Sequence, residues 1–95
     1  MALHTVNLLP GAAATEAILA QLRDGDAVLF HGDGAWHAAA PGLDAWARSR
    51  VTLHVLAADL AGCGLAERCD PRVTVVDAAG FLALTERHAA QRAWF

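Results

Sequence analysis

Two cysteines are the side chains of this sequence that could most readily carry out covalent chemistry. Cys63 lies between Gly62 and Gly64, and five residues separate it from Cys69. A cysteine that carries sulfur must be accessible and must be held as a thiolate by a helix N-terminus or a nearby cation. The spacing is not CxxC and no second pair of ligands follows, so no zinc site is predicted. In a reducing cytoplasm a structural disulfide is not expected either.

A glycine-containing turn, His31-Gly32-Asp33-Gly34, follows an apolar segment and precedes a helical one. Backbone N–H groups at such a junction can bind an anion, and ligands or partners commonly bind where the strands of an α/β sheet end. The segment has neither the GxGxxG spacing nor the Lys-Ser/Thr pair of nucleotide-binding loops. We therefore predict a tight turn. The alternative is an anion- or partner-binding loop, in which Trp36 would take part.

The five histidines do not form a recognisable metal site. No two of them are four residues apart, the spacing that places two ligands on one face of a helix. His4 and His54 fall in strand-like segments, where we expect hydrogen bonds rather than a metal ion. The sequence also contains nothing that resembles a nucleophile elbow.

Four aromatic residues are the predicted contacts with a partner: Trp36, Trp46, Trp94 and Phe95. Tryptophan is enriched at the energetic centres of protein interfaces, and a small alanine-rich domain can cover few such rings. The segment that ends in Trp94 and Phe95 either folds back on the chain's own sheet or packs on a partner. We predict that it packs on a partner.

The composition favours one small domain, residues 1–95. Of the 95 residues 56% are hydrophobic, but many of these are alanines, which contribute little transfer free energy. A domain with so modest a core often gains stability from a partner. The net charge is −3, lysine is absent and the seven arginines are scattered, so direct binding of nucleic acid, which requires clustered cations, is not expected.

The sequence carries no signal for a membrane or for secretion. No apolar stretch approaches the roughly 18 residues that suggest a membrane span. The first residues lack the basic segment of a secretory signal. We therefore expect a cytoplasmic protein.

Short apolar segments alternate with helical ones along the chain. The predicted strands are Leu3–Val6, Ala27–Phe30, Val51–Leu56 and Val73–Val76. The predicted helical segments are Ala12–Arg23, Ala35–Ala40, Leu43–Arg48, Asp59–Leu65 and Phe81–His88. This alternation implies right-handed βαβ units. The predicted fold is α/β, a three-layer α/β/α arrangement around a mainly parallel sheet of four to five strands.

Five fragments resemble, in the same order, segments of the TusB/DsrH family. They are Leu3–Asn7, Gly25–Leu29 with Asp33-Gly34, Val55–Leu60 with Gly64-Leu65, Val75–Asp77 with Gly80–Glu86, and Gln91–Phe95. Each fragment alone is a weak match, but five in register over a chain of the family's length are fairly specific. The resemblance covers the whole chain and implies a single TusB/DsrH-like domain with the DsrE-like fold.

The resemblance also implies a setting for the protein. Members of the family assemble with two DsrE-like sister subunits, TusC/TusD-like or DsrF/DsrE-like, as a dimer of heterotrimers. This assembly passes persulfide sulfur from protein to protein, and no cofactor is implied. In the Tus branch the sulfur ends in 2-thiouridine at the tRNA wobble position, and in the Dsr branch it serves dissimilatory sulfur oxidation.

One departure from the family pattern concerns the thiol. Members of the DsrH branch often have a cysteine in the middle of the first helix, and the corresponding position here is Ile18 or Leu19. The resemblance therefore implies a non-catalytic subunit and favours the Tus branch. The alternatives are a DsrH-like subunit of sulfur oxidation, a sulfur carrier that uses Cys63, and a small anion-binding α/β module that uses the Gly32–Gly34 loop.

Overall fold

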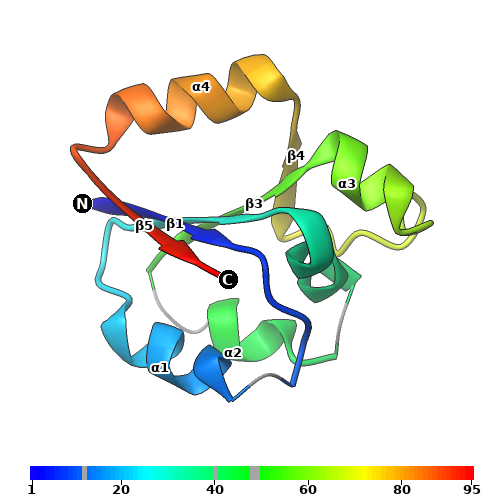
Figure 1. Ribbon diagram of the computed structural model, residues 1–95, viewed down its shortest axis with the longest axis horizontal. Coiled ribbons are helices and arrows are strands. Elements are labelled where there is room, and N and C mark those ends of the chain that lie inside the picture. The colour runs from blue at the N-terminus through cyan, green and yellow to red at the C-terminus, as the bar shows by residue number, and fades with distance from the viewer. Residues whose placement is uncertain (12, 40, 48–49) are drawn as a thin grey trace.

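The chain folds around a five-stranded parallel sheet in the order β4-β3-β2-β1-β5 (Figure 1). The computed structural model describes residues 1–11, 13–39, 41–47 and 50–95. The strands are β1 (Ala2–Val6), β2 (Ala27–Phe30), β3 (Thr52–Leu56), β4 (Val73–Val76) and β5 (Ala90–Trp94). The helices are α1 (Ala14–Gln21), the 3-10 helix η1 (Gly32–Ala39), α2 (Leu43–Ala47), α3 (Ala57–Gly62) and α4 (Ala78–Arg87). Three ends of predicted segments lie outside the described residues: Ala12, Ala40 and Arg48.

β2 is the central strand of the sheet. All of its residues are buried, and β1 and β3 pair with it on either side, so that Ala27 lies beside both Leu3 and Thr52. A continuous apolar run is typical of a parallel strand that is covered on both faces. The predicted strand Ala27–Phe30 is confirmed.

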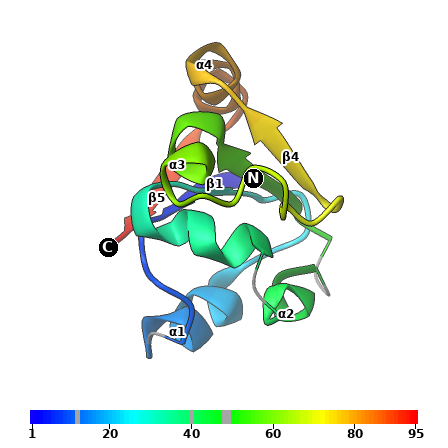
Figure 2. The ribbon, with the colours of Figure 1, turned by 90° about the vertical axis from the view of Figure 1, so that its right-hand side faces the viewer.

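Helices cover both faces of the sheet. α4 lies over one face, and α1 and α2 lie against the other (Figure 1 and Figure 2). The larger core cluster includes Ile18 of α1 and Trp46 of α2, and the smaller one joins Leu3 and Leu29 to Leu84 of α4. The predicted three-layer α/β/α arrangement is confirmed. None of the helices formed by the described residues combines the length and the apolar character that crossing a membrane requires.

The segment after β2 differs from the prediction in type and extent. A short helix was expected over Ala35–Ala40, and the chain instead forms the 3-10 helix η1 from Gly32 onward. Gly34 explains this start, because its backbone passes so close to the end of β1 that a Cβ atom would overlap the Val6 carbonyl oxygen. The absence of a side chain at Gly34 therefore lets the start of η1 lie directly against the carboxyl end of β1.

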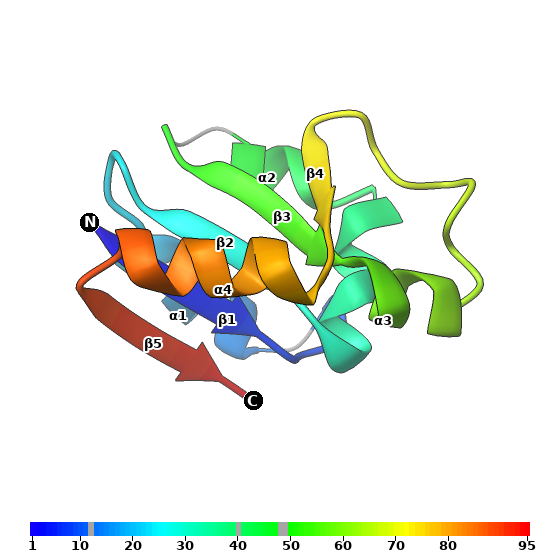
Figure 3. The ribbon, with the colours of Figure 1, turned by 90° about the horizontal axis from the view of Figure 1, so that it is seen from above.

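The C-terminal segment is the second difference. We predicted that it packs on a partner, but it forms β5 and pairs in parallel with β1, from Ala2 beside Ala90 to Val6 beside Trp94. The pairing continues past the strand, since the Asn7 amide donates to the Trp94 carbonyl at 2.8 Å. β5 thereby pairs with backbone N–H and C=O groups of β1 that would otherwise lack hydrogen-bond partners in the sheet. Seen from above, β5 and β4 form the two outer edges of the sheet (Figure 3).

The close approach of η1 to the end of β1 can be tested with a single methyl group. Gly34→Ala is expected to lower the free energy of unfolding by about 1–3 kcal/mol, because the added Cβ meets a backbone carbonyl rather than a flexible side chain. Gly62→Ala in α3 is the control, since nothing lies within 4 Å of a Cβ there, and it should be neutral or stabilising by about 0.5–1 kcal/mol. Urea unfolding measures both, and equal midpoints for the two variants would contradict the packing.

Candidate partner-binding site

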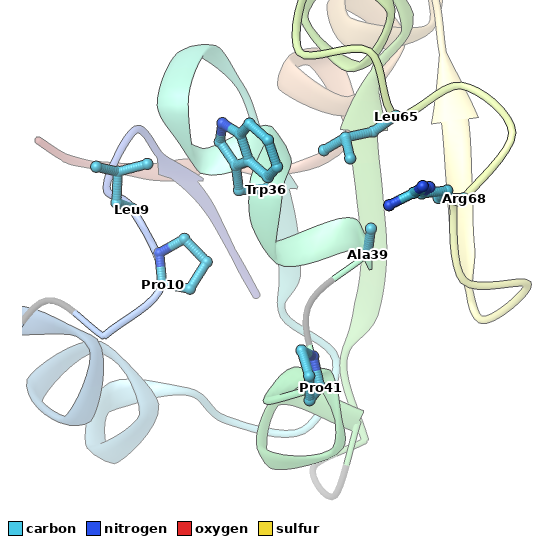
Figure 4. A pocket seen from close by; sticks show the side chains of 7 residues that line it. All are labelled: Leu9, Pro10, Trp36, Ala39, Pro41, Leu65 and Arg68. Carbon is cyan, nitrogen blue, oxygen red and sulfur yellow. The ribbon is translucent and has the colours of Figure 1, made fainter.

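A mostly apolar groove of about 470 Å³ lies where the chain leaves β1 and β2 (Figure 4). Its lining residues are Leu9, Pro10, Trp36, Ala39, Pro41, Leu65 and Arg68. The segment after β1 supplies one wall, η1 runs through the middle, and the residues after α3 supply the other wall (Figure 4). The carboxyl ends of strands in an α/β sheet are where ligands and partners usually bind.

Two large apolar side chains of the groove are exposed to water. Trp36 of η1 is 42% exposed and Leu9 is 52% exposed. Exposed rings of this kind are common at the energetic centres of protein interfaces. Arg68 supplies the one basic side chain of the lining and makes no ion pair with any acidic residue that the structure describes. Trp36 stays a predicted partner contact.

His37 joins η1 to the segment after β1, which forms one wall of the groove. Its Nε2 atom donates to the Leu8 carbonyl at 2.8 Å, and its ring stacks on Phe30 with 5.1 Å between centroids. Burial lowers the pKa of His37, and the bond to Leu8 offsets only part of this effect, so the neutral form of the ring is favoured. The sequence analysis missed this role. In a 3-10 helix, residues three apart lie on the same face, so His37 and Gly34 both face the end of β1 and the residues that follow it. This spacing could have revealed the role of His37 only if the 3-10 helix had been predicted.

Trp46 was also predicted to contact a partner, and the structure corrects this. Its side chain is 1% exposed and lies in the core, edge-on to Phe30 at 5.1 Å and to His37 at 5.3 Å. A ring enclosed by the chain's own α2 and β2 is not available to another protein. Trp46 instead contributes to the core packing that supports η1.

The backbone donors of the His31–Gly34 turn are already used within the chain. The Gly32 amide donates to the Asp59 carboxylate at 2.7 Å, the Asp33 amide to the Asn7 side-chain oxygen at 2.8 Å, and the Gly34 amide to the His31 carbonyl at 2.8 Å. An anion would have to displace these bonds and approach the carboxylate of Asp59. The turn is therefore a tight structural turn, and the anion-binding alternative loses the donors on which it depended.

Trp94 is tied to the sheet by a chain of buried polar groups. Its Nε1 atom donates to His4 Nδ1 at 3.2 Å, and His4 Nε2 donates to the Asp26 carboxylate at 3.0 Å. Burial alone would raise the pKa of Asp26, but hydrogen bonds from the Ala2 amide, from His4 and from the Arg23 amide outweigh it and lower the pKa. The prediction that hydrogen bonds satisfy both His4 and His54 is confirmed for His4, whereas His54 keeps a buried Nδ1 atom without a partner in the described structure.

Trp94 and Phe95, which were both predicted to contact a partner, have different surroundings. Trp94 packs partly against the larger core cluster and donates its only side-chain N–H within the chain. Phe95 is 87% exposed. Of the pair, Phe95 offers the larger unpaired surface to a partner and stays a predicted contact.

Neither cysteine lies at a helix N-terminus, the position that would stabilise a thiolate. Cys63 is half-buried against the larger core cluster and follows the C-terminal end of α3, whereas thiolates gain stabilisation at helix N-termini. Burial raises the pKa of the Cys69 thiol, and the carboxylate of Asp70 raises it further. Within the described residues no three His, Cys, Asp or Glu side chains form a cluster that could hold a metal ion.

Comparison with known proteins settles the family. The DsrH-like protein family matches residues 10–91. The chain is 36% identical to Protein TusB of Klebsiella pneumoniae (strain 342) and 32% identical to Protein TusB of Sodalis glossinidius, each over 94 residues that cover 97% of this chain and 99% of the other. The chain belongs to the TusB/DsrH family. Protein TusB of Pectobacterium parmentieri is similar at 33% identity over the same lengths.

Family membership confirms the resemblance drawn from the five sequence fragments. The structure also shows the surroundings of Ile18 and Leu19, the two positions at which the resemblance would place a first-helix cysteine. Ile18 of α1 is fully buried in the larger core cluster, and Leu19 packs against the same cluster. Both side chains serve the core of the domain.

The neutral, buried state of His37 predicts a pH dependence of stability. Its folded pKa lies below the ordinary value of 6.5, so below that pH the unfolded chain binds a proton that the folded chain does not, and stability falls as the pH drops. His54, whose pKa burial also lowers, acts in the same direction. His37→Gln keeps a donor for the Leu8 carbonyl but removes one titration.

Urea unfolding between about pH 7 and pH 5 measures this effect. The His37→Gln variant should lose less stability on acidification than the wild-type chain, although it starts from a lower value because the ring stack on Phe30 is gone. Identical acid slopes for the two proteins, at equal denaturant m values, would show that His37 is not the buried neutral group described here.

Proposed function

We propose that the chain is a non-catalytic subunit of a sulfur-relay complex of the TusBCD or DsrEFH type. In this proposal it holds together two DsrE-like sister subunits, TusC/TusD-like or DsrF/DsrE-like, in a dimer of heterotrimers that acts in the cytoplasm. The observation that carries the proposal is the match to TusB proteins over 97% of the chain. The settings of Cys63 and Cys69 support it, since Cys63 follows the C-terminal end of α3 and burial and Asp70 raise the pKa of the Cys69 thiol.

The most specific form of the proposal is the Tus branch, in which the persulfide sulfur ends in 2-thiouridine at the tRNA wobble position. The named relatives are TusB proteins, and the first-helix position where DsrH-branch members often have a cysteine falls at Ile18 or Leu19. The tRNA would bind another subunit, because this chain carries a net charge of −3 and no cluster of basic residues in its sequence.

The groove is the surface that we assign to a sister subunit. Trp36 and Leu9 offer exposed apolar area, and Arg68 offers a positive charge that makes no ion pair with an acidic residue of the described structure. The complementary partner segment is an apolar side chain followed or preceded by a carboxylate, which would bury the indole and pair with the guanidinium. The His37 bond to Leu8 fixes the walls before binding, which lowers the entropic cost of docking.

The free edge of β5 is a second candidate surface. The strand residues from Ala90 to Ala93 are exposed, and Phe95 projects beyond them with 87% exposure. An unpaired strand edge can be extended by a strand of another chain, and a neighbouring aromatic ring adds apolar contact. The groove and this edge could therefore hold two different sister subunits.

Co-purification with the two sister subunits tests the assignment of the groove. Trp36→Ala should reduce the yield of complex strongly, since truncation of a central interface tryptophan costs about 2 kcal/mol or more. Leu82→Ala is the matched control. Leu82 is a 60% exposed apolar residue on α4, on the other side of the sheet, so its loss should leave the yield unchanged.

Unfolding curves of the isolated variants must accompany this experiment. Trp36 is exposed, so its variant should be about as stable as the wild-type chain. Unchanged yield with Trp36→Ala would remove the groove from the interface. Failure of the wild-type chain to associate with any DsrE-like subunit would remove the proposed function itself.

A further inference from the structure

A second, smaller hollow lies at the amino edge of the sheet, beneath the C-terminal end of α4. Its volume is about 250 Å³, and it is lined by Met1, Gly25, Thr52, His54, Leu84, Arg87 and His88. Met1 and Gly25 precede β1 and β2, and Thr52 is the first residue of β3. Three of the lining side chains are basic and none is acidic, which separates this hollow from the groove.

Arg87 carries a positive charge that no carboxylate balances. All ten acidic residues of the sequence fall within the described part of the chain, and none of them lies within ion-pair distance of its guanidinium. Unpaired guanidinium groups beside an apolar hollow are suited to planar recognition of oxyanions.

His88 leaves one ring nitrogen available beside this charge. It is 9% exposed, and its Nδ1 donates to the Leu84 carbonyl at 2.8 Å, so the neutral ring has its proton on Nδ1. Nε2 makes no hydrogen bond to any residue that the structure describes. Protonation at Nε2 would thus add a donor without breaking an existing bond.

His54 approaches the same place from β3. Its Nε2 pairs with Thr52 Oγ1 at 3.0 Å, and its Nδ1 is buried with no hydrogen-bond partner in the described structure. Burial lowers the pKa of His54, and the positive charges of Arg87 and His88 lower it further. The partial negative charge at the end of α4 accounts for basic residues on that helix, but not for a third one that faces them from the sheet.

We propose that this hollow binds a small doubly charged oxyanion of the phosphate or sulfate type, held by Arg87, His54 and His88. The volume is below the 300–1,000 Å³ or so of pockets for nucleotide- or drug-sized molecules, which favours a small ion. The anion supplies the negative charge that no carboxylate of the chain provides to Arg87, and it can accept hydrogen bonds from the free ring nitrogens of His54 and His88 when these carry a proton. The hydroxyl of Thr52 is positioned to support His54. This site is independent of the sulfur-relay assignment.

Calorimetric titration with inorganic phosphate, at constant ionic strength and about pH 6, tests the site in the whole chain. The wild-type protein should bind one phosphate saturably, and Arg87→Gln should weaken the affinity by about tenfold or more, because a charge-assisted bond is lost. Arg23→Gln is the matched control. It removes the same charge from an exposed residue outside the hollow and should bind phosphate as the wild type does.

Ring signals in NMR spectra give a second readout of the same titration. The His54 and His88 signals should shift with phosphate and saturate together, while those of His37, in the core on the other side of the sheet, should not. The absence of saturable binding would overturn the proposal, and so would an equal loss of affinity in Arg87→Gln and Arg23→Gln. Sulfate should compete with phosphate for the site.

Discussion

The buried hydrogen-bond chain from Trp94 through His4 to Asp26 is the interaction on which the rest of the sheet depends. It joins the last strand to the first and to the residue before the second. An indole can only donate, so His4 accepts at Nδ1 and donates at Nε2, and only one neutral tautomer satisfies both neighbours. Any other position of β5 would break the hydrogen bond between Trp94 and His4. Each buried polar group left unpaired would then cost about 1–3 kcal/mol.

The fixed position of β5 has a direct consequence for function. With the tail on its own sheet, the surfaces that we propose for other proteins are the outer edge of β5 with Phe95 and the groove around Trp36. The thiols are placed differently, since Cys63 follows the end of a helix and Cys69 is disfavoured as a thiolate by burial and by Asp70. These placements support the proposal that this TusB/DsrH chain offers contacts to partners rather than a reactive sulfur.

Local patterns predicted what local interactions determine. The apolar runs Ala27–Phe30 and Val73–Val76 form strands within the predicted bounds: the first is a central strand buried on both faces, and the second is an edge strand rich in β-branched residues. β5 was not predicted as a strand, since Gln91 and Arg92 interrupt any apolar pattern and only pairing with β1, almost ninety residues away in sequence, makes the segment extended. The enclosure of Trp46 likewise arises from long-range packing.

The central claim is that this subunit acts through its surfaces and not through a thiol. Its most direct test is 2-thiouridine formation by the complex of both sister subunits with the double variant Cys63→Ala/Cys69→Ala. The account predicts a rate near that of the wild-type complex, provided that the variant assembles with equal yield. Loss of thiolation in a fully assembled complex, restored by returning either cysteine, would contradict it.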